Sequence, residues 1–150
     1  MRSLLRPLSA AVLVLVVLAA CSKTAEPPTG RWQGVYEDAG LLVVARLEIT
    51  PNGAVRVSAP NAIGDFGTMP QSERGQLRAR LENELAQAWD KVGTLPLEFD
   101  GKDFRKPGGV APQLEWNAKA HRMTMIYYSG NRASVRVPLD SVKDFGGANS

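Results

Sequence analysis

The sequence predicts an α+β fold: a curved antiparallel sheet or partial barrel of about seven strands, with one long amphipathic helix inserted after the third strand. Three observations lead to this prediction. Apolar and polar residues alternate with a period of two on both sides of the chain's middle, tight-turn signals join the alternating segments, and one central segment has a period of three to four. Because strands and helices do not alternate along the chain, a parallel sheet is not expected.

The first strands are expected at 31–36, 41–49 and 55–59. The second of these alternates most clearly, which is typical of a strand with one buried face and an opposite face that is wet at its far end. The Asn52-Gly53 pair between the second and third strands is a strong hairpin signal. The glycine-containing segment 61–70 is expected to form a loop.

The helix is expected over 71–92. Ser72 or Thr68 would cap its start and Gly93 would end it. Its polar residues fall around the rest of the helical wheel, so the apolar stripe must pack against another element, most simply the sheet. The stripe consists of Leu77, Leu81, Leu85, Ala88, Trp89 and Val92.

Strands resume after the helix, and Asp100-Gly101 marks another tight turn. Pro138 cannot donate a hydrogen bond to a neighbouring strand, which predicts that this part of the last strand lies at an edge. Phe145 is expected to fold back onto the domain. The strands of this half are expected at 95–99, 102–104, 113–117, 122–128 and 134–139.

The amino terminus has the pattern of a secretion signal. Arg2 and Arg6 carry positive charge ahead of an apolar segment that runs from Leu8 to Ala20 with one serine. A helix of about 13 residues is roughly 20 Å long, whereas a membrane span needs about 20 residues. The segment is therefore predicted to be a signal peptide and not a stable span.

The signal ends in Leu18-Ala19-Ala20-Cys21, and Cys21 is the single cysteine of the chain. This run resembles the lipobox of bacterial lipoproteins. The resemblance implies cleavage before Cys21, a diacylglyceryl group on its thiol, and acylation of its freed amine with a fatty acid such as palmitate. Such chains anchor a protein in a membrane. Ser22 follows the cysteine where, by the same resemblance, an aspartate would favour the inner membrane, so the periplasmic leaflet of the outer membrane is expected.

The charge balance of the chain changes when the signal peptide is removed. The chain carries 18 basic and 15 acidic residues, and removal of Arg2 and Arg6 leaves 16 basic residues against 15. Because the mature chain is close to neutral and its basic residues are scattered among acids, no nucleic-acid partner is expected.

The sequence patterns divide the chain into four expected regions. These are a signal peptide at 1–20, a lipidated cysteine and tether at 21–29, one α+β domain at 30–145, and a frayed tail at 146–150.

The residues for common catalytic and metal sites are scarce. His121 is the only histidine and is expected in a solvated hairpin turn, while Cys21 would be occupied by lipid. A zinc site needs several histidine or cysteine ligands, so no metal and no other cofactor is expected. Asp100, Asp103 and Glu115 are acids that neighbouring strands could bring together, as in glycosidases, but any two acids on neighbouring strands would do so, and a wet strand face is the preferred explanation. The chain is therefore predicted not to be an enzyme.

The aromatic residues suggest a binding role more strongly than the acids or the histidine suggest catalysis. Trp32, Trp116, Tyr127 and Tyr128 are candidate ligand-binding residues, because a partly exposed ring on a concave sheet can anchor an apolar ligand or a protein. Gly30-Arg31-Trp32 is similar to the Gly-x-Trp that opens lipocalin-like barrels. That resemblance implies a barrel that holds a small apolar ligand, although lipocalins place their helix near the end of the chain.

These observations predict a membrane-anchored lipoprotein of the cell envelope, with a non-catalytic binding or interaction domain that faces the periplasm. Its partners would be the membrane, through acyl chains on Cys21, and either an envelope protein or a small apolar ligand. Two alternatives remain open. The domain could inhibit an envelope-damaging enzyme such as lysozyme through the Ser129-Gly130 turn, or it could be a lipocalin-like carrier of a small apolar ligand.

Overall fold

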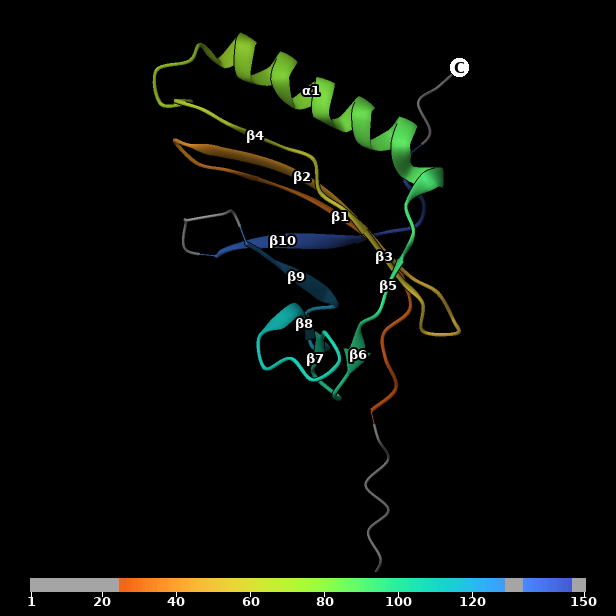
Figure 1. Cartoon of the computed structure of the whole chain (residues 1–150). Helices are drawn as coiled ribbons and strands as arrows, with labels where there is room; N and C mark the ends of the chain where they lie inside the picture. The colour runs from red at the N-terminus through yellow and green to blue at the C-terminus, as the bar shows by residue number, and fades with distance from the viewer. Residues whose placement is uncertain (1–24, 129–133, 147–150) are drawn as a thin grey trace, which may run out of the picture.

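The computed structural model describes residues 25–128 and 134–146. Within them the chain has the predicted α+β fold, in which an antiparallel sheet curls into a half-barrel and one helix packs on its outer face (Figure 1). The sheet of the described residues contains ten strands: β1 (Gly30–Glu37), β2 (Leu41–Ile49), β3 (Val55–Ser58), β4 (Asn61–Ile63), β5 (Thr94–Leu95), β6 (Glu98–Phe99), β7 (Asp103–Arg105), β8 (Pro112–Asn117), β9 (Arg122–Tyr127) and β10 (Val135–Val142).

The order of the strands explains the curl. Along the sheet they follow β5-β3-β2-β1-β10-β9-β8-β7-β6, and β4 pairs with β2 beside this path. Strands β5 and β6 therefore end the sheet on opposite edges, yet only Pro96 and Leu97 separate them in the chain. A connection of this length spans at most about 11 Å. The two edges of the sheet must consequently lie close together, which requires the sheet to bend back on itself.

The count of about seven strands was too low. The segment 61–70, expected to be a loop, begins with β4, which pairs with the first residues of β2 while β3 pairs with the last ones. Between β3 and β4 the carbonyl of Pro60 accepts a hydrogen bond from Val44 at 3.0 Å, so the two short strands continue along the same neighbour. Strands of two or three residues are too short to show alternation in a sequence.

The helix begins at the predicted residue but is not capped as predicted. Helix α1 spans Gln71–Ala88, and a 3₁₀ turn, η1, follows at Trp89–Lys91. Pro70 is the N-cap residue, without a side-chain cap, and its carbonyl accepts hydrogen bonds from the backbone of Glu73 and Arg74. The expectation of a Ser72 or Thr68 cap is therefore wrong. At the other end Val92 is already extended, so the helical conformation stops before Gly93.

Strand β2 is buried on both faces and belongs to two separate cores. Its odd-numbered residues from Leu41 to Ile49 point into the half-barrel, and Leu42 and Val44 point outward against the helix. The inner core also contains Trp32, Val55, Phe104, Leu114, Met123, Met125, Val137 and Leu139. The outer core also contains Phe66, Leu81, Leu85 and Trp89, with Phe145 partly buried against it. Both cores thus lie entirely after residue 30, so the chain beyond the expected tether contains all of their residues.

The part of the last strand around Pro138, predicted at an edge, pairs with one neighbour only, although the strand as a whole is central. Strand β10 is in the middle of the sheet, between β1 and β9, and Pro138 lies opposite Thr124 of β9. The register between β10 and β1 ends at Asp140 and Gln33, before it reaches Pro138. A proline is tolerated there because the hydrogen-bond ladder on its β1 side has already ended, although the strand itself is central.

Gly34 of β1 lies against the backbone of β10, and this generates a stability prediction. A Cβ atom at this position would overlap the carbonyl oxygen of Pro138. Because backbone atoms cannot move aside cheaply, we expect Gly34→Ala to lower the free energy of unfolding by about 1–3 kcal/mol. Urea denaturation followed by circular dichroism measures this change.

Gly75 in α1 provides the matched control, because a Cβ atom there meets no other atom within 4 Å. Replacing this helical glycine with alanine should stabilise the domain by about 0.5–1 kcal/mol. Equal effects of the two substitutions would contradict the close approach of β1 and β10.

Candidate functional site

A groove of about 640 Å³ lies between α1 and the outer face of β1, β2 and β10. Its volume is within the range of small-molecule sites, about 300–1,000 Å³. The groove exists because α1 crosses over β2 and leaves part of the neighbouring strands uncovered (Figure 1). The helix contributes Glu82, Asn83 and Ala86 to one wall, and the sheet contributes Val35 and Val44 to the opposite wall.

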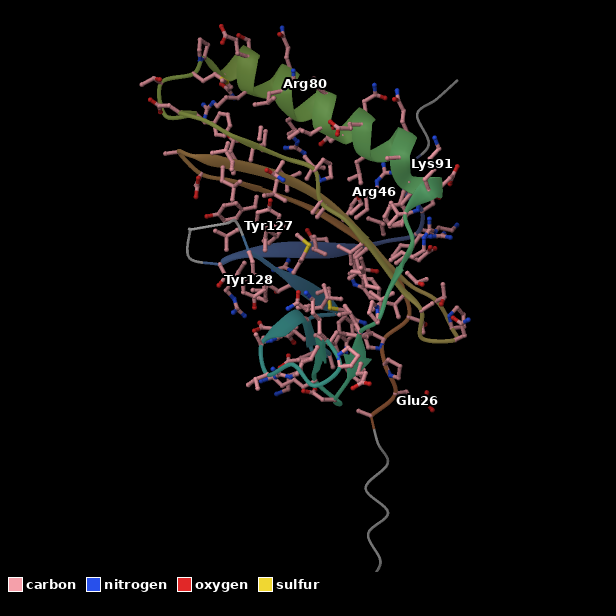
Figure 2. All side chains as sticks on the ribbon, in the orientation of Figure 1. Glu26, Arg46, Arg80, Lys91, Tyr127 and Tyr128 are labelled. Carbon is pink, nitrogen blue, oxygen red and sulfur yellow. The ribbon has the colours of Figure 1, made fainter. Side chains whose placement is uncertain are left out.

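Arg46 lies on the sheet side of this groove, beneath the helix (Figure 2). It also lines a second hollow of about 560 Å³, which continues towards Trp89 and Phe145. Its guanidinium carbon lies 5.0 Å from the centre of the Phe145 ring. Partial burial lowers the pKa of Arg46, and the negative charge of Glu82 acts in the opposite direction.

The end of the helix is fastened to the sheet by a network of ion pairs beside Arg46. Glu48 accepts hydrogen bonds from Arg31 at 2.8 Å and from Arg56 at 3.0 Å. Arg56 also donates to the carbonyls of Trp89 and Val92, at 2.6 and 3.0 Å, and lies 4.7 Å from the centre of a Trp89 ring. These carbonyls belong to the last helical turn and its cap, where a positive charge is favourable. The network therefore fixes one end of the groove.

The charged residues along the main groove differ in their pairing. Arg78 donates to Glu82 at 2.8 Å, and Asp140 accepts from Arg122 at 3.1 Å. The Arg46 side chain forms no hydrogen bond or ion pair with any residue that the structure describes; it lies over the Phe145 ring and feels the negative charge of Glu82. Arg46 is thus the wall residue whose charge has no bonded counterpart among 25–128 and 134–146.

Comparisons with known proteins add no relative. No protein family matches the chain, and neither the curated proteins nor the solved structures gave a match. The candidate site therefore rests on its own geometry.

The aromatic residues predicted as ligand-binding candidates lie away from the groove. Trp32 is 2% exposed inside the half-barrel and meets Trp116 edge-on, with ring centres 5.9 Å apart. Trp116 and Tyr127 are half-buried against the same inner core. Tyr128 is 50% exposed, and its hydroxyl donates to the carbonyl of Pro112 at 3.0 Å. Figure 2 shows both tyrosines on the β9 side of the sheet.

The predicted acidic residues gather on the outer face of β7 and β8, also away from the groove. Asp103 lies directly opposite Glu115 in the strand register. Asp103 is buried and accepts a hydrogen bond from Arg105 at 2.9 Å, while Glu115 pairs with Arg136. Each of these carboxylates therefore already has a basic partner.

Two further predictions concern the turn histidine and metal ligands. His121 is exposed in the turn between β8 and β9, with its ring 5.7 Å from that of Trp116. In the described part of the chain no three histidine, cysteine or acidic side chains form a group that could hold a metal ion. Cys21 and the Ser129-Gly130 turn lie outside the described residues. None of the described helices has the length and apolar character needed to cross a membrane.

The sequence contained one signal for the groove that our interpretation did not use. The outward face of β2 begins with two apolar residues that pack under the helix, Leu42 and Val44, and the next residue on this face is Arg46. A basic residue on the same face as a helix-covered apolar pair indicates the boundary of the covered area. The remaining wall residues are ordinary surface or core types, which carry no such signal.

Asp100 stabilises the β6–β7 turn and generates a pH prediction. The backbone N–H of Asp103, the Arg105 side chain and the backbone N–H of Lys102 donate to its carboxylate and hold its pKa at about 2, below the usual value near 3.9. A carboxylate with a lowered pKa stabilises the folded state above its unfolded pKa, and this contribution is lost as the pH falls towards 2.

We therefore expect Asp100→Asn, whose amide oxygen can still accept the two backbone hydrogen bonds, to reduce the loss of stability between about pH 4 and pH 2. Thermal unfolding midpoints of the two proteins across this window measure the difference. Parallel curves would show that Asp100 does not contribute to the acid sensitivity.

Proposed function

We propose that this protein is a lipid-anchored lipoprotein of the cell envelope whose periplasm-facing domain binds a ligand or a partner segment, without catalysis, in the groove beneath α1. The groove itself is the observation that carries the binding role. It combines an adequate volume, a lining that is about half apolar and half polar, and one arginine whose side chain has no bonded counterion among the described residues. In binding sites apolar surface contributes affinity and polar groups fix the orientation of the ligand.

Ionisable groups along the groove support binding over catalysis. Glu82 is bonded to Arg78, and Asp140 is bonded to Arg122, so each carboxylate has a guanidinium partner at hydrogen-bond distance. A general acid or base needs a free proton position near the reacting atom. Arginine remains protonated and therefore serves better as an anion-binding group than as a base.

The anchor is supported by the Leu18-Ala19-Ala20-Cys21 run and by the position of the chain that follows it. Ala25 lies beside the β6–β7 turn, within 3.9 Å of where a Cβ atom on Gly101 would be. The chain from Cys21 to Ala25 can span about 14 Å at most. A lipid on Cys21 would therefore hold this end of the domain close to the membrane, and Ser22 favours the outer one.

The anchor is tested by mass spectrometry of the mature protein purified from bacterial envelopes. We expect the first residue to be Cys21 with acyl chains attached, and the protein to sediment with outer membranes. Cys21→Ser should remain unmodified and appear in the soluble or unprocessed fraction, because without acyl chains the mature chain has no membrane anchor. An unmodified wild-type cysteine would contradict the anchor but would leave the groove unaffected.

The groove is tested by placing a photocrosslinking amino acid at Asn83 in intact cells. Asn83 lines both hollows, whereas Arg80 is an exposed residue of the same helix that does not line the groove (Figure 2). We expect light-dependent adducts from Asn83 and none from the matched probe at Arg80. Equal labelling at the two positions, or labelling at neither, would contradict a binding role for the groove.

A further inference from the structure

The charge pattern of the groove limits what it can bind. Arg46 has five N–H donors, none of which donates to a described residue, and it is partly desolvated under the helix. A carboxylate fits a guanidinium in a planar, two-point arrangement. Glu82 lines the same groove and would repel a second negative charge. The electrostatics therefore favour a ligand with a single acidic group.

The apolar part of the groove lies next to this arginine. Val35 and Val142 come from the outer faces of β1 and β10, and Leu85 and Ala86 come from the helix. Val44 lies two residues before Arg46 in β2, on the same face of the strand, so the apolar and charged surfaces are adjacent. The groove is open along one side and could receive an extended chain.

From this juxtaposition we propose that the groove binds a single-chain amphiphile with a free carboxylate, such as a long-chain fatty acid. The carboxylate pairs with Arg46, and the hydrocarbon chain lies along the part-exposed apolar residues of the lining, Val35, Ala86 and Val142. This inference rests on the proposed binding role of the groove and gives it a ligand class. It makes Arg46 the residue that distinguishes an acid from an uncharged molecule with the same chain.

The other wall of the groove is compatible with this occupant. Asn83 lines both hollows and supplies an amide donor opposite the sheet. Phe145 contacts Arg46 through its ring and not through a hydrogen bond, so this contact leaves the N–H groups available to an acid. Phe145 also meets Trp89 edge-on, with ring centres 4.8 Å apart, and both rings line the second hollow near the end of the helix.

The test is a titration of residues 22–150, which contain both cores, by isothermal titration calorimetry with three probes. Dodecanoate has both the acid and the chain, dodecanol has the chain alone, and acetate has the acid alone. We expect dodecanoate to bind at least tenfold more tightly than either of the other two. Equal affinity for dodecanol and dodecanoate would overturn the proposal, since Arg46 would then have no part in recognition.

Variants locate the site. We expect Arg46→Gln to weaken dodecanoate binding at least tenfold, Arg46→Lys to weaken it less because the charge remains, and Ala86→Phe to weaken it by filling the apolar part. Arg80→Gln, on an exposed part of α1, is the matched control and should bind like the wild type. Circular dichroism and the unfolding midpoint of each variant separate loss of binding from loss of folding. Unchanged affinity of folded Arg46→Gln, or of folded Ala86→Phe, would overturn the proposal.

Different results would contradict the fatty-acid ligand and the binding role of the groove. If dodecanoate does not bind at 1 mM while the probe at Asn83 still forms specific adducts in cells, the groove binds something else and only the ligand class is wrong. If neither experiment shows binding, both proposals fall.

Discussion

The short connection between β5 and β6 is the constraint on which the architecture depends. These strands end the sheet on opposite edges, but Pro96 and Leu97 alone join them, and the N–H of Leu97 donates to the carbonyl of Leu95 across a tight turn. A sheet of ten strands would otherwise remain open, with its inner face exposed. The covalent link closes the distance between the edges, and the inner core forms from side chains that the resulting curvature brings together.

The curvature of the sheet also accounts for the burial of both faces of β2. Its inward residues fill the half-barrel, and its outward residues Leu42 and Val44 need a cover of their own, which α1 provides through Leu81 and Leu85. The helix is narrower than the outer face of the sheet, so it cannot cover β1 and β10 as well. The groove is the space that remains beside a helix whose position is fixed by the outer core and by the Arg56 contacts at its end.

Acids and arginines pair on the outer face of the sheet. Arg122 of β9 pairs with Asp140 of β10, and Arg136 of β10 pairs with Glu115 of β8, on the far side of β9. Exposed pairs of this kind contribute little to stability, typically less than about 1 kcal/mol each, but they leave no excess charge. Beneath the helix, Glu48 holds both Arg31 and Arg56, whereas Arg46 has no bonded acid in the described chain. The groove therefore differs from the rest of this face in having an arginine without a bonded acid among the described residues.

The sequence alone determined the fold class, the start of the helix and the main hairpins, because alternation over β2 and three-to-four spacing over α1 are local patterns. It also generated the prediction of a lipid anchor at Cys21. Only the tertiary structure decided the place of Pro138 in a central strand, the short strand β4, the division of 95–99 into β5 and β6, and the inward burial of Trp32, since each depends on neighbours distant in the chain. The groove belongs to the same group. Arg46 is recognisable in the sequence as a basic residue in an apolar strand, but the helix wall opposite it, and the pairing of Glu82 and Asp140 with other arginines, follow only from packing.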